Sequence, residues 1–167
     1  MAQTRTEIPF AGVRVRYGSS KTYGELVAAL LADIGDKPVP IGDIAVGFDT
    51  WESYERAVGS HVGPSGFMLF AQFDHGGWIN KAGIETKVLR VVLGNPLIAI
   101  TMLRHDVTAG LFAPVELLIT EEDDGGSAIT YVVPSSLMVV EPNEPLRVAA
   151  QALDDKIAAL ATKVTAT

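Results

Sequence analysis

The first regular pattern along the chain is an alternation of apolar and charged residues over residues 13–17 (VRVRY). Every second side chain then falls on one face, which is typical of a half-buried strand. From Leu26 to Ile34 the apolar residues recur instead at three- and four-residue steps, behind the capping-box sequence Thr22-x-x-Glu25. Gly35 follows, where a helix commonly ends. The pattern therefore predicts a strand and then an amphipathic helix.

Residues 36–66 have no such regularity, and we predict an inserted flap that lies on the main body. A group of Pro and Gly residues marks a loop, followed by a short extended piece at residues 44–48. Asp49 is placed to begin a short helix with Trp51 and Tyr54 on one face. These aromatic side chains are most simply explained as a cover for the core, and ligand stacking is the alternative. The segment would act either as a lid or as filler.

Two strands follow, and each ends in a distinctive turn. Residues 67–73 (FMLFAQF) form a continuous apolar run of strand length that stops at Asp74 and His75. The next strand, residues 86–93, runs into Gly94-Asn95-Pro96 and then into an apolar helix over residues 97–103. Asn is a favoured helix N-cap, Pro suits the first helical position, and Gly permits a tight turn.

The last third of the chain predicts a β-hairpin and a long helix. Residues 115–121 and 128–133 are strand-like and joined by an acidic turn ending in Asp-Gly-Gly. We interpret the acidic residues 121–124 as solvated rather than as a cation site. After Asn143, apolar residues recur at helical spacing as far as Val164, and this face must cover the protein's own sheet or a partner subunit.

Together these elements predict an α+β (mixed α/β) fold. We expect a two-layer sandwich, with a mixed sheet of about five strands covered by helices, a late hairpin and a long C-terminal helix. A single domain over residues 1–167 fits the chain length.

Composition narrows the class of protein further. The 48% hydrophobic and 20% charged residues are typical of a globular chain, and the net charge of −7 argues against nucleic acid or an anionic membrane as a partner. The absence of cysteine excludes disulfides and thiolate chemistry. No apolar run is long enough for a secretory signal or a membrane helix, so we expect a soluble, cytoplasmic protein.

Five motifs in order resemble a known family. They are Asp74-His75, Gly94-Asn95-Pro96, the apolar helix at 97–103, Ala113-Pro114, and Tyr131-x-x-Pro134. Over roughly residues 67–164 the chain resembles the bacterial "domain of unknown function 302" family. The resemblance implies a small α/β fold, a soluble location and a homodimer, but no reaction. Relative to that family, the segment 36–66 is extra and the helix after His75 is shortened.

A binding site depends on how the two strands at 67–73 and 86–93 run. If they are parallel, Asp74 and His75 lie at the same sheet edge as Asn95, where open α/β sheets bind ligands. His75 would then contact a ligand, Asp74 would fix its tautomer, and the N–H groups after Asn95 would receive an anion. The alternative is that Asp74 and Asn95 are helix caps and His75 bonds a backbone carbonyl. Antiparallel strands would place the two turns at opposite ends and remove this pocket.

We expect neither a metal nor a cofactor, because His61, His75 and His105 lack the spacing of metal ligands and no phosphate-binding or nucleophile motif is present. Our leading hypothesis is a homodimeric small-molecule-binding or sensing module. Its candidate ligand-binding residues are Asp74, His75, Gly94, Asn95 and Tyr131, and its ligand would be a small molecule or anion. One alternative is an enzyme with His75 as general base. Another is a structural or interaction module that uses the C-terminal helix at Leu153 and Ile157.

Overall fold

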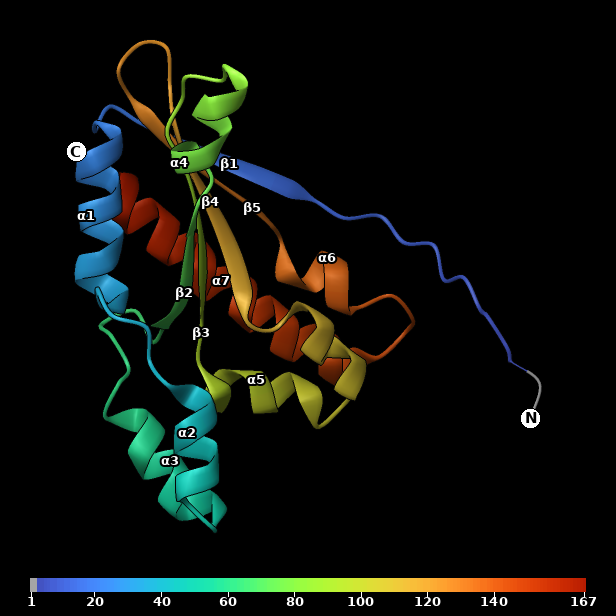
Figure 1. The fold of residues 1–167 in the computed structure, drawn as a ribbon. Coiled ribbons are helices and arrows are strands. Elements are labelled where there is room, and N and C mark those ends of the chain that lie inside the picture. Colours follow the sequence, from blue (N-terminus) through green and yellow to red (C-terminus); the bar gives the residue numbers. More distant parts are fainter. Residues whose placement is uncertain (1–2) are drawn as a thin grey trace.

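The computed structural model describes residues 3–167, and residues 1 and 2, which the expected single domain includes, lie outside the described residues. The described chain forms one sheet and a layer of helices (Figure 1). The strands are β1 (Arg14–Ser19), β2 (Met68–Asp74), β3 (Val88–Gly94), β4 (Val115–Glu121) and β5 (Ser127–Val132). They lie in the order β1-β5-β4-β3-β2. The α+β class, the five strands, the late hairpin and the long C-terminal helix are confirmed.

Every neighbouring pair in this sheet is antiparallel, so the expectation of a mixed sheet needs correction. The reason lies in the connections. Only the short helix α4 (Gly76–Ile79) and the 3-10 turn η1 (Asn80–Ala82) separate β2 from β3. A parallel pair would need a crossover helix that carries the chain back along the sheet.

Helices α1 (Tyr23–Ile34) and α7 (Glu144–Thr165) cover one face of the sheet (Figure 1). The predicted capping box begins α1, with Thr22 and Glu25 bonded reciprocally. The register places Leu89 opposite Ile119 and Val91 opposite Leu117, so their buried side chains form one continuous surface beneath the helices. The apolar face of α7 is buried against this surface, which makes the protein's own core its partner.

The other face of the sheet carries the alternate residues, which are half-buried or exposed. Arg90, Glu116 and Thr130 belong to this face, which we call the open face. Two short elements lie at one end of it, η2 (Val107–Phe112) and α6 (Pro134–Met138), while α5 (Pro96–Leu103) connects β3 to η2. The open face is where solvent reaches the sheet.

Residues 36–66 contain two helices, α2 (Ile41–Gly47) and α3 (Trp51–Gly59), which extend from the end of the sheet near α5 (Figure 1). The extended piece predicted at residues 44–48 is wrong. Ile41 and Ile44 are three residues apart, so a helix turns both to one side, where they are half-buried. The α3 helix is capped by Thr50 through Ser53 rather than by Asp49.

A buried carboxylate fastens this segment to the body. Asp33, at 4% exposure, accepts hydrogen bonds from the Ser65 backbone N–H at 3.2 Å and from the Ser65 hydroxyl at 2.7 Å. The Lys163 ammonium of α7 donates to the same side chain at 2.6 Å. Asp33 therefore joins the end of α1, the end of the flap and the C-terminal helix.

In the described part of the chain no helix is both long and apolar enough to cross a membrane.

Candidate functional site

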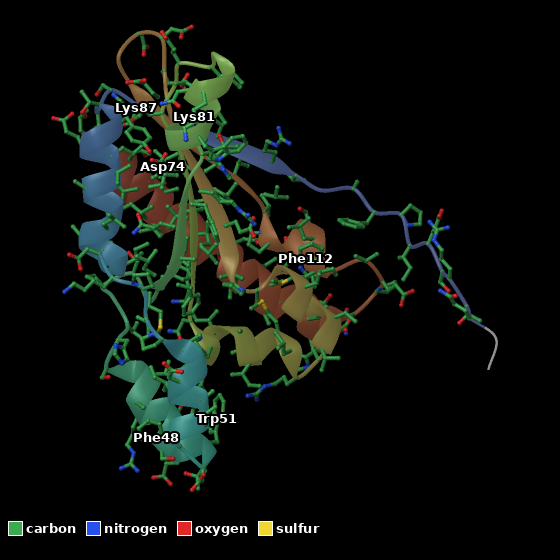
Figure 2. The ribbon with its side chains drawn as sticks, viewed as in Figure 1. Phe48, Trp51, Asp74, Lys81, Lys87 and Phe112 are labelled. Atoms are coloured by element: carbon green, nitrogen blue, oxygen red, sulfur yellow. The ribbon has the colours of Figure 1, made fainter. Side chains whose placement is uncertain are left out.

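The two turns expected to share a pocket lie at opposite ends of the sheet. Because β2 and β3 are antiparallel, Asp74 pairs with Leu89 at one end and Gly94 pairs with Met68 at the other. Figure 2 shows Asp74 beside α4, far from the α5 end of the sheet. The condition for a pocket formed by both turns is not met.

The Asp74–His75 turn is a local surface structure. The Asp74 carboxylate accepts a hydrogen bond from the backbone N–H of Gly77 at 3.0 Å, and His75 Nδ1 accepts from Trp78 Nε1 at 3.3 Å. The His75 and Trp78 rings meet edge to face, with centroids 6.0 Å apart. Within residues 3–167 no hydrogen bond joins Asp74 to His75. Asp74 thus caps α4 and does not orient the imidazole.

Asn95 serves as a helix cap that also holds the flap. Its side-chain oxygen accepts from the Leu97 N–H at 2.8 Å, and its side-chain nitrogen donates to the carbonyl of Gly66 at 2.9 Å. The residue is 9% exposed. A Cβ at Gly94 would lie 3.0 Å from Phe70 and 3.2 Å from Pro114, so glycine allows a close approach of these two rings. Asn95 and Gly94 therefore both have a structural role, Asn95 through its hydrogen bonds and Gly94 through close packing.

A small apolar cavity lies next to this turn. Its volume is about 290 Å³. Its lining residues are Ile41, Phe67, Phe70, Gly94, Asn95, Pro96, Ile98, Ala99, Met102, Ala113, Pro114, Val115 and Leu153. Asn95 brings the one polar side chain of this lining, and that side chain is already bonded at both ends. The cavity thus offers shape but little that could orient a polar ligand.

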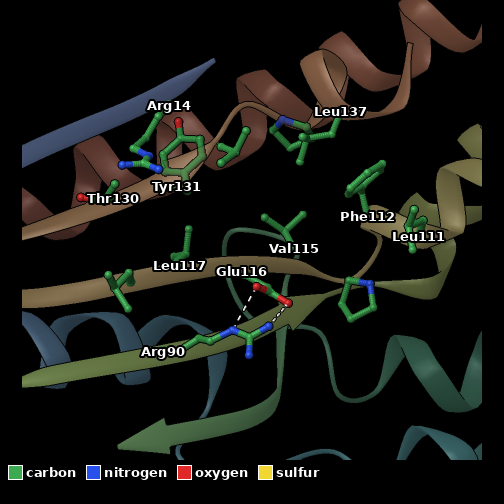
Figure 3. A pocket seen from close by; sticks show the side chains of 14 residues that line it. Arg14, Arg90, Leu111, Phe112, Val115, Glu116, Leu117, Thr130, Tyr131 and Leu137 are labelled. Carbon is green, nitrogen blue, oxygen red and sulfur yellow. Dashed lines mark hydrogen bonds and ion pairs between the residues drawn. The ribbon is translucent and has the colours of Figure 1, made fainter. Parts of the chain in front are cut away.

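A larger groove opens on the other side of Pro114 and Val115, which line both spaces. It forms where β4 and β5 separate: they pair from Leu118 with Thr130 to Glu121 with Ser127, and diverge beyond. The groove has a volume of about 660 Å³. Figure 3 shows its lining. The lining residues are Arg14, Arg90, Leu111, Phe112, Pro114, Val115, Glu116, Leu117, Leu118, Thr130, Tyr131, Val132, Pro134 and Leu137.

The polar part of the groove comes from the open face of the sheet. Arg90 makes a two-pronged pair with Glu116, with Nε donating at 3.0 Å and the terminal nitrogen completing the pair (Figure 3). The hydrogen bonds that Arg90 donates to Glu116, and the negative charge of that carboxylate, raise the pKa of Arg90. The guanidinium also lies over the Phe73 ring, 5.5 Å from its centroid. Arg90 is thus held between Glu116 and the Phe73 ring.

Tyr131 is part of the groove wall and is turned toward the helix layer. It is 5% exposed and stacks on Tyr17, with ring centroids 6.1 Å apart and planes 8° from parallel. Burial, the hydrogen bond to Tyr17 and the charge of Asp154 raise its pKa, so the phenol ionises only at a more alkaline pH than an ordinary tyrosine. Of the five predicted ligand-binding residues, Gly94 and Asn95 lie at the small cavity, Tyr131 at the groove, and Asp74 and His75 at neither.

Sequence reasoning missed the polar groove residues Arg14, Arg90, Glu116 and Thr130, and the apolar residues of η2 and α6. The alternation at residues 13–17 does place Arg14 on the polar face of its strand. That alternation does not show which residue lies opposite Arg14 on the next strand. The neighbour is Val132, and it is set by the register of β1 with β5.

The apolar face of the C-terminal helix is not available as an interface, because Leu153 and Ile157 are both buried in the core. Among residues 3–167, no group of three or more His, Cys, Asp or Glu side chains could hold a metal ion.

Comparison with known proteins identifies the fold and the family. No curated protein matches the sequence. The structure is similar to the crystal structure of an uncharacterised conserved protein, DUF302, from Bacillus stearothermophilus, with a TM-score of 0.64 and 18% identity over 90% of this chain and 97% of that one. The family model "Domain of unknown function DUF302" matches residues 44–164, which takes in most of the segment that the motifs mark as extra. The resemblance seen in the five motifs is confirmed, and the chain belongs to the DUF302 family.

Proposed function

We propose that this protein is a small-molecule-binding or sensing module and that the groove on the open face of the sheet is its binding site. The observation that carries the proposal is the composition of one space of about 660 Å³. Pockets for small molecules usually have a volume of this order, an apolar wall and a few convergent polar groups. The groove has Arg14, the Arg90–Glu116 pair and Thr130 on one side and apolar side chains on the other.

The small cavity at the Gly-Asn-Pro turn is the weaker site. It has less than half the volume of the groove, and the Asn95 amide already bonds Leu97 and Gly66. A ligand there would have to break a helix cap to reach a polar partner. The homodimer that the family resemblance implies and the cytoplasmic location expected from the sequence stay predictions.

A thermal-shift screen against carboxylic acids, alcohols, amines and sugars tests the proposal. Leu111→Asp places a carboxylate at the apolar end of the groove, and the 79% exposure of Leu111 means that the fold tolerates it. Val107→Asp is the matched control, because Val107 belongs to the same 3-10 helix, is 78% exposed and does not line the groove.

We expect at least one class of compound to stabilise the wild type and Val107→Asp, and to lose its effect on Leu111→Asp. His75→Ala should respond as the wild type does, because His75 lies outside the groove. A screen with no stabilising compound, or equal stabilisation of Leu111→Asp and Val107→Asp, would contradict the proposal.

A further inference from the structure

The charges along the groove differ in how far they are already neutralised. Arg90 is paired with Glu116 inside the groove. Arg16, two residues after Arg14 on the same face of β1, is paired with Glu122 at 2.6 Å. Arg14 lines the groove and has no carboxylate within ion-pair distance among residues 3–167. In the described chain it is therefore the groove's free cation.

Among its described lining residues, the groove has no free anion to match this cation. Its titratable lining residues are Arg14, Arg90, Glu116 and Tyr131. Glu116 is neutralised by Arg90, and Tyr131 is uncharged at neutral pH, as an ordinary phenol is, with burial raising its pKa further. A ligand that enters this space meets one uncompensated positive charge. The chain as a whole has a net charge of −7, so the potential in the groove is more positive than the average over the protein surface.

The far end of the groove is apolar and comes from two different elements. Leu111 and Phe112 belong to η2, and Leu137 belongs to α6, across the groove from them (Figure 3). Phe112 is held in turn by an edge-to-face contact with Phe10, whose centroid lies 6.2 Å away. Arg14 lies at the other end, next to Tyr131 and Thr130 in the same view. Cation and apolar walls thus stand at opposite ends of one space.

From this arrangement we infer that the groove selects an amphipathic anion. The acidic end of the ligand lies at Arg14, within reach of the Thr130 hydroxyl, and its apolar body lies against Leu111, Phe112 and Leu137. An amine would meet the uncompensated guanidinium and lose solvation without a partner. A neutral ligand of the same length would gain only the apolar contacts. The inference rests on the proposed function, since it names the class of ligand that the proposed site takes.

Three probes of equal chain length separate these cases: octanoate, 1-octanol and octylamine, each titrated by calorimetry at neutral pH. The variants are Arg14→Gln, which removes the charge, and Arg14→Lys, which keeps it. Arg16→Gln is the matched control, because it removes an arginine from the same strand and face outside the groove. Arg14 is exposed, so the substitutions leave the core untouched.

We expect octanoate to bind the wild type more tightly than 1-octanol by about three- to tenfold, the contribution of one charge-assisted contact at a partly exposed site, and octylamine to bind least. Arg14→Gln should remove this preference while leaving 1-octanol unchanged, and Arg14→Lys and Arg16→Gln should keep it. Equal binding of the three probes, or a preference that survives in Arg14→Gln, would overturn the inference but leave a binding groove. No binding of any probe, together with an empty thermal-shift screen, would overturn the proposed function itself.

Discussion

Replacement of Asn95 by alanine tests whether this residue stabilises the fold or is available to bind a ligand. The substitution removes two hydrogen bonds at once, the cap on the Leu97 N–H and the bond to the Gly66 carbonyl. Loss of an N-cap costs about 0.5–2 kcal/mol, and an unpaired, partly buried carbonyl adds about 1 kcal/mol or more. The free energy of unfolding should therefore fall by about 2–3 kcal/mol. For a chain of this size that corresponds to a drop in Tm of roughly 5–10 °C.

Urea unfolding followed by far-UV circular dichroism measures this difference, and Asn95→Asp dissects it. Aspartate keeps the oxygen that caps the helix but cannot donate to Gly66, so its loss should be about half that of alanine. A loss below about 0.5 kcal/mol for Asn95→Ala would refute the reasoning, because the two bonds would then contribute nothing measurable. The side chain would be free to serve a ligand at the Gly-Asn-Pro turn.

Three other substitutions probe the body of the protein. Gly63→Ala should unfold it or lower its stability by more than about 3 kcal/mol in urea, because a Cβ there would lie 2.0 Å from the Asp33 carbonyl oxygen. Burial raises the pKa of Asp33, but the hydrogen bonds from Lys163 and Ser65 outweigh it and the pKa is lowered. The stability that this carboxylate supplies is thus fully present above the unfolded-state pKa of about 3.9 and is lost as the pH falls through the folded-state pKa. Asp33→Asn should be less stable than wild type at pH 7 by roughly 1–3 kcal/mol, with the gap closing in acid, and a constant gap would contradict the account. Because burial raises the pKa of Tyr131, its phenol should ionise at a higher pH than the other tyrosines in a spectrophotometric alkaline titration. Tyr131→Phe should remove that high-pH ionisation step, and a variant that keeps the step would contradict the burial of the Tyr131 hydroxyl.

Local signals in the sequence predicted local structure well. The capping box at Thr22 and the cap at Asn95 each depend on residues within three positions, and both are present as predicted. The five strands begin and end within about two residues of their predicted bounds, because alternation and apolar runs are properties of single segments. The helix at residues 41–47 was missed because Pro40 and two glycines mask a short apolar spacing.

The direction of β2 relative to β3 could not be predicted in the same way. It depends on whether the residues between the strands form a crossover or a simple return, and Gly76 and Gly77 leave both open. The direction of these strands determines whether the pocket predicted from the two turns can form. Because β2 and β3 are antiparallel, Asp74 and Asn95 lie at opposite ends of the sheet. The groove was missed for a related reason: its lining comes from β1, β3, η2, β4, β5 and α6, which are spread along the whole sequence.

The pair Arg14 and Arg16 shows where specificity enters this fold. In the sequence the two arginines are equivalent. Each has an apolar residue on either side of it, and both arginines lie on the same face of one strand. They differ only through the register of β1 with β5, which sets Arg14 opposite Val132 at the groove and Arg16 opposite Thr130, where Glu122 reaches it. A slip of two residues that set Arg14 opposite Thr130 would keep every side chain on its own face of the sheet, yet it would bring Arg14 to the position that Glu122 reaches and put Gly12 opposite Val132 at the groove. The anion selectivity inferred for the groove is therefore a property of strand register, and residues that fix that register should matter to binding without touching the ligand.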